Sequence, residues 1–127
     1  PGGRSTMGRL FADAGICYLW KDNGDKGSLS LTFEGVFDRA RNADWWLIKQ
    51  GWPAPPSRKM LADEFPHAER FKAWREGKVL VCNTLATPYF EEVPFHPERL
   101  LQELAAIFHP SLRPEDFAPR YFYYLEK

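Results

Sequence analysis

The chain has 127 residues, which is enough for one compact domain built around one hydrophobic core. Its 17 basic and 17 acidic residues balance, which removes the electrostatic case for binding nucleic acid or an anionic membrane surface. No stretch is long and apolar enough to cross a bilayer. Aromatic residues make up 16% of the chain, more than a small core needs, so we expect some of them in loops where they bind a ligand.

The first half of the chain alternates helix and strand patterns. Ser5 is expected to cap a helix that ends near Ala14 and stops at Gly15. The apolar run 16–19 predicts a strand, and a polar loop follows it over residues 21–28.

A second helix and a second strand follow. Thr32 is the expected cap of this helix, whose apolar stripe consists of Phe33, Val36, Phe37 and Ala40. The apolar run within residues 43–49 predicts a strand that is covered on both faces.

The second half continues the alternation. Helices are expected from Ser57 to about Phe65, over 67–76 with a stop at Gly77, and over 97–108 behind Pro97. Strands are expected over residues 79–82 and 121–125, with a long loop over 83–95. This order predicts an α/β fold, a three-layer α/β/α Rossmann-like lobe with a mostly parallel central sheet, spanning 1–127 as a single lobe.

The two cysteines, Cys17 and Cys82, have no metal-type spacing, and each falls in an expected strand. We expect buried, inert thiols, with a disulfide between them as the alternative.

Ligands of open parallel sheets bind beyond the carboxyl ends of the strands. The loops expected at that edge carry aromatic side chains, and Arg4 precedes the first helix, where it could pair with an acidic group. The candidate ligand-binding residues are Arg4, Trp20, Trp52, Tyr89 and Phe90. The alternative for Trp20 and Trp52 is that they fold back to cover the core.

Catalysis has little support in the sequence. The histidines, His67, His96 and His109, fall at expected helix ends without zinc-type spacing, and no nucleophile pairs with a base. Glu91 and Glu92 are neighbours whose side chains would point apart. We therefore expect no catalytic residue, no metal site and no cofactor.

Several segments together resemble the C-terminal lobe of a family of importer receptors. A small-residue turn leads into a helix ending in Ala-Gly, a Thr precedes Glu34 at a helix start, and Ala-Asp precedes an apolar strand. A helix, glycine turn and strand follow, and then a long helix that ends in His-Pro. These segments are residues 1–15, 29–36, 42–44, 71–79 and 97–110. In order and spacing they are similar to the helical-backbone (class III) periplasmic substrate-binding proteins of ABC importers.

The resemblance implies a two-lobed receptor that captures a corrinoid, haem or a ferric siderophore and docks on the transmembrane permease. It implies that Glu34 faces arginines of the permease. It also implies a periplasmic or cell-envelope location, with a lipid anchor as one option in the parent protein. The parent would be a monomer, whereas this lobe, without its N-terminal lobe and linking helix, could self-associate. The alternatives are a small α/β enzyme and a protein-interaction domain.

Overall fold

The computed structural model describes residues 1, 3–22, 24, 26 and 31–125. It divides into two compact units. The helical unit comprises Pro1–Thr32 and Glu92–Ala118, and the sheet unit comprises Phe33–Glu91 and Pro119–Lys127. The prediction of one lobe over 1–127 stays a prediction.

The sheet unit contains a three-stranded sheet in the order β1-β2-β3. Strands β1 (Trp46–Gln50) and β2 (Val79–Asn83) are parallel, and β2 pairs antiparallel with the short β3 (Tyr123–Tyr124). The connection from β1 to β2 passes through helices, as a parallel pair requires. The protein is thus mixed α/β, with one parallel pair of strands.

Four helical segments of the sheet unit lie along this connection or just before β1. They are α2 (Phe33–Ala40), α3 (Arg58–Glu64), the 3-10 helix η1 (Ala68–Arg70) and α4 (Lys72–Arg75). The Ser57 hydroxyl accepts a hydrogen bond from the Met60 N–H at 3.2 Å, which confirms Ser57 as the cap of α3.

The core of the sheet unit forms where these helices meet one face of the sheet. Ile48, Val79 and Val81 pack there with Leu61 and Trp74. Of the apolar stripe predicted for α2, Val36, Phe37 and Ala40 are partly buried against this cluster, whereas Phe33 is exposed. Aromatic rings dominate the contacts, as with Phe37 and Phe71, which meet edge to face at 5.4 Å between centroids.

The helical unit contains α1 (Thr6–Asp13), α6 (Pro97–Phe108) and the 3-10 helix η2 (Pro110–Leu112). The Ser5 hydroxyl accepts from the Gly8 N–H at 3.1 Å, as its predicted capping role requires. Gly15 adopts a φ of 70° and ends α1 as expected, and the neighbouring Ala14 carbonyl lies 2.7 Å from Nε2 of His109.

The strand predicted over residues 16–19 is wrong, because residues 16–18 have no regular structure and a turn follows. The Ile16 N–H donates to the Phe11 carbonyl at 2.8 Å, so the chain folds back on the end of α1. The Tyr18 ring packs on Phe11 at 5.0 Å, and its hydroxyl donates to the Pro1 carbonyl. Cys17 is exposed, contrary to prediction, whereas Cys82 is buried; both are free thiols.

Three other expectations need correction. The helix predicted over 67–76 is interrupted, because His67 has a left-handed φ of 69° and Phe71 is extended. The predicted loop over 83–95 contains a short helix, α5 (Tyr89–Glu92). Strand β1 is not covered on both faces, since Lys49 and Gln50 are exposed at its end.

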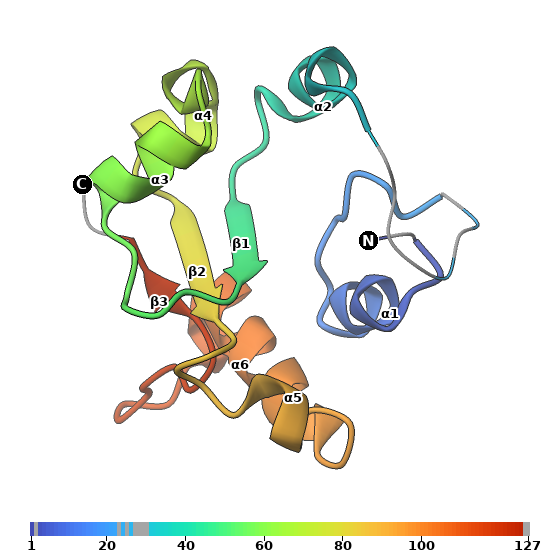
Figure 1. Cartoon of the computed structure of the whole chain (residues 1–127). Helices are drawn as coiled ribbons and strands as arrows, with labels where there is room; N and C mark the ends of the chain where they lie inside the picture. Colours follow the sequence, from blue (N-terminus) through green and yellow to red (C-terminus); the bar gives the residue numbers. More distant parts are fainter. Residues whose placement is uncertain (2, 23, 25, 27–30, 126–127) are drawn as a thin grey trace. The chain divides into compact units, whose positions relative to one another are not determined.

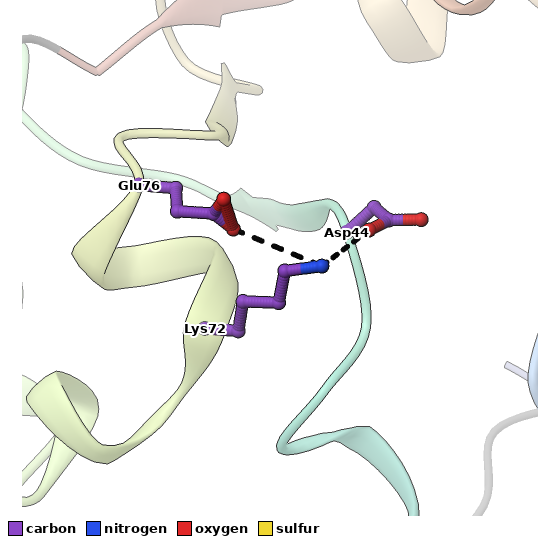
Figure 2. A network of polar contacts seen from close by, with 3 residues as sticks. All are labelled: Asp44, Lys72 and Glu76. Carbon is purple, nitrogen blue, oxygen red and sulfur yellow. Dashed lines mark hydrogen bonds and ion pairs between the residues drawn. The ribbon is translucent and has the colours of Figure 1, made fainter.

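An exposed ion-pair network joins the segment before β1 to α4 (Figure 2). The Lys72 ammonium group lies 3.0 Å from Asp44 and 3.9 Å from Glu76. Its hydrogen bond lowers the pKa of the Asp44 carboxyl. Exposed pairs of this kind contribute little stability. The Lys72 N–H donates to the Arg41 carbonyl at 2.9 Å, which adds a backbone link at the same place.

No helix in the described part of the chain has the length and apolar character that crossing a membrane demands.

Candidate functional site

The parallel strands β1 and β2 end at the same edge of the sheet, and their following loops leave from it (Figure 1). We call residues 49–52 and 83–90 the strand-end edge. Edges of this kind are where parallel sheets bind ligands.

The buried Asn83 side chain joins the two loops of the strand-end edge. Its Oδ1 accepts from the Trp52 N–H at 2.9 Å and from the Leu85 N–H at 3.1 Å. Its Nδ2 donates to the Trp52 carbonyl at 3.1 Å. Both backbone polar groups of Trp52 are therefore hydrogen-bonded, although Trp52 lies beyond the end of β1.

The two loops also approach each other closely at Gly51. A Cβ atom at this position would lie 2.9 Å from Cγ of Leu85 and 3.3 Å from the Thr84 hydroxyl. The Thr84 N–H donates to the Gln50 carbonyl at 3.0 Å, which extends the ladder by one bond. A side chain at position 51 would have to displace the Leu85 side chain.

Trp52, a sequence-predicted ligand residue, is 6% exposed and belongs to the core of the sheet unit. Its indole N–H donates to Glu64 at 3.3 Å, and the Gln50 amide donates to the other oxygen of the same carboxylate at 2.8 Å. For Trp52 the structure thus shows the alternative considered from the sequence, a side chain that folds back over the core.

Tyr89 and Phe90 come together at the start of α5, with perpendicular rings 5.3 Å apart. Tyr89 is buried and meets Tyr121 edge to face at 6.0 Å, whereas Phe90 is 61% exposed. Burial raises the pKa of the Tyr89 phenol to about 12, so that the group is neutral at physiological pH. Leu85, 70% exposed, adds a second apolar side chain to the edge.

Lys49 is a member of this group that the sequence reading missed. Its ammonium nitrogen lies 4.5 Å from the centre of the Tyr89 ring and 5.9 Å from that of Phe90. It also donates to the Tyr89 hydroxyl at 3.3 Å. Lys49 as a whole is exposed, but partial desolvation of its amino group against these rings lowers the pKa of that group. Strand alternation was the available signal, because a residue next to the buried Ile48 points to the opposite face.

The remaining predicted residues lie elsewhere. Arg4 is exposed and Trp20 is half-buried beside Tyr18, at 6.0 Å between rings, both in the helical unit. Their place at the same edge stays a prediction. Glu34 is exposed in the first turn of α2.

The groups considered for catalysis are dispersed. His96 is exposed and pairs with Glu98 at 3.1 Å, and Glu91 is exposed. His67 packs against the Phe33 ring. Within the residues that the structure describes, no group of three or more acidic, cysteine or histidine side chains could hold a metal ion.

Comparison with known proteins finds no matching family model and no matching solved structure. The chain is similar to an uncharacterized lipoprotein of Methanocaldococcus jannaschii, with 29% identity over 97 residues. The match covers 74% of this chain and 21% of the lipoprotein, so the chain spans about a fifth of that relative's length.

We predict that Asn83→Ala destabilises the protein strongly. It leaves the buried N–H and carbonyl of Trp52 without partners, and each such group costs roughly 1–3 kcal/mol. Gln50→Ala is the matched control, since Gln50 lies opposite Asn83 in the sheet register but its side chain is exposed. Urea denaturation measures both. Equal effects of the two substitutions would contradict the role given to Asn83.

We predict that one tyrosine ionises near pH 12 and that Tyr89→Phe removes this component. Because the folded-state pKa is raised above the usual value of about 10, the stability it contributes is complete below pH 10 and lost as pH rises through 12. Absorbance at alkaline pH follows the titration, with circular dichroism to monitor folding. Tyr124→Phe, at an exposed position, is the control and should retain the late component.

Proposed function

We propose that this chain is the C-terminal ligand-binding lobe of the substrate-binding protein of an ABC importer, one that captures a corrinoid, haem or a ferric siderophore. The strand-end edge carries the proposal. It presents the exposed side chains of Phe90 and Leu85 beside the buried Tyr89 at the carboxyl ends of two parallel strands. A large, flat and partly apolar ligand can pack on such a surface.

The finer architecture belongs to the same proposal. We infer a three-layer α/β/α lobe with a mostly parallel sheet, in which β1, the α3–α4 connection and β2 form one strand–helix–strand unit. The helices that cover one face of the sheet and the parallel register of β1 with β2 support this inference. The linking helix and the other lobe would lie in the rest of the parent protein, as the coverage of one fifth of the similar lipoprotein allows.

The same comparison supports the proposed cellular location. The similar protein is named a lipoprotein, which supports a place in the cell envelope with a lipid anchor in the parent. A receptor held at the membrane surface can deliver its ligand to a permease beside it. Glu34, exposed on the first turn of α2, is the residue we propose to meet arginines of that permease.

We predict that the full-length parent binds a member of one of the three ligand classes. Titration with cyanocobalamin, haemin and a series of ferric siderophores, followed by tryptophan fluorescence, measures this. Absence of binding to all three classes would refute the proposed cargo.

We predict that Glu34→Ala in the full-length parent weakens transport severalfold and leaves ligand affinity unchanged, since one rim charge pair to the permease is lost. Uptake by reconstituted transporter and ligand titration are measured on the same variant. Glu69→Ala, which removes another exposed carboxylate of the sheet unit, is the control. Lower ligand affinity with normal uptake at saturating ligand would show that Glu34 is not a docking residue.

A further inference from the structure

Lys49 is an exposed residue of the strand-end edge whose ammonium group lies over one aromatic ring and near a second. It follows Ile48, which is buried in the core, so its side chain leaves the opposite face of β1. Its ammonium group contacts the Tyr89 ring and hydroxyl and lies near the Phe90 ring. It forms no ion pair with any residue in the described part of the chain.

This setting leaves the positive charge of Lys49 incompletely compensated. Aromatic faces and a phenol oxygen attract a cation, but they carry no net charge. The partial loss of hydration that lowers the pKa of Lys49 would be offset by an anionic oxygen placed beside it. Tyr89 does not oppose such an anion, because its phenol is neutral below about pH 12.

Apolar surface lies next to this charge. Phe90 is 61% exposed and its ring centre is 5.9 Å from the Lys49 ammonium group. Leu85, also exposed, follows Asn83 in the adjoining loop. A ligand that fits both features carries an anionic group close to a flat or apolar body.

We propose that Lys49 is the anion-recognising residue of the strand-end edge, and that the ligand presents a carboxylate to it while its apolar body packs on Phe90. This inference rests on the proposed function and narrows it. Haem, with two propionates, and carboxylate siderophores meet the requirement. Cyanocobalamin, whose corrin side chains are neutral amides, offers no carboxylate.

The test compares an acidic with a neutral ligand within each class on the full-length parent. The probe pairs are haemin against its dimethyl ester, a monocarboxylic acid of cyanocobalamin against cyanocobalamin itself, and ferric citrate against ferrichrome. Dissociation constants come from quenching of tryptophan fluorescence. In the class that binds, we expect the acidic member to bind roughly tenfold or more tightly, as a charged hydrogen bond provides.

Substitutions assign this preference to Lys49. Lys49→Met keeps an unbranched side chain over Tyr89 but removes the charge, so we expect the acidic probe to lose about tenfold in affinity and the neutral probe to change little. Lys49→Arg should keep the preference. The control is Lys78→Met, because Lys78 also lies over an aromatic ring, that of Trp45 at 5.8 Å, but just before the start of β2.

The outcomes separate the two proposals. Binding of a neutral probe as tightly as its acidic partner, unaffected by Lys49→Met, would overturn the role of Lys49 and leave the importer function standing. Absence of binding by every probe would overturn both. Lys49→Gln provides a second neutral variant if Lys49→Met fails to fold, and circular dichroism verifies the fold of each variant.

Discussion

The strand-end edge depends on the bonding of Asn83 to the backbone of Trp52. Both groups are buried, so removing either partner would leave unpaired polar groups in the core and lower the stability of the fold. This pairing keeps the loop after β1 beside the loop after β2. Tyr89 then begins α5 at a fixed place relative to Lys49, at the end of the neighbouring strand. The hydrogen bonds of Asn83 thus help to place the Lys49 ammonium group and the Tyr89 ring beside each other at the ends of two adjacent strands.

The elements that the sequence predicted well are those with local signals. Ser5 and Ser57 cap helices because their hydroxyl groups reach the first free N–H groups, and Gly15 and Gly77 end helices because they accept positive φ angles. Pro97 begins α6 as expected. The strand–helix–strand order and the buried strand β2 follow from the alternation of apolar runs, so the mixed α/β structure could be predicted from the sequence.

The errors arise where contacts that a local apolar pattern does not reveal decide the outcome. The apolar run 16–19 has strand character, but the end of α1 offers its residues a nearer apolar surface and a free carbonyl. Trp52 follows a strand as a ligand residue would, yet Glu64 and Asn83 hold it in the core. Lys49 was overlooked because its significance depends on Tyr89, 40 residues later in the chain.

The positions of the strand-end edge differ in how freely they accept a new side chain, and Gly51 is the most restricted of them. A Cβ atom there would meet the side chains of Leu85 and Thr84, so a substitution requires at least the Leu85 side chain to move. Leu85 and Phe90, by contrast, project into solvent and can be exchanged without moving the backbone that carries them. Single substitutions at Leu85 or Phe90 can therefore change the apolar surface of the edge while the loops keep their course.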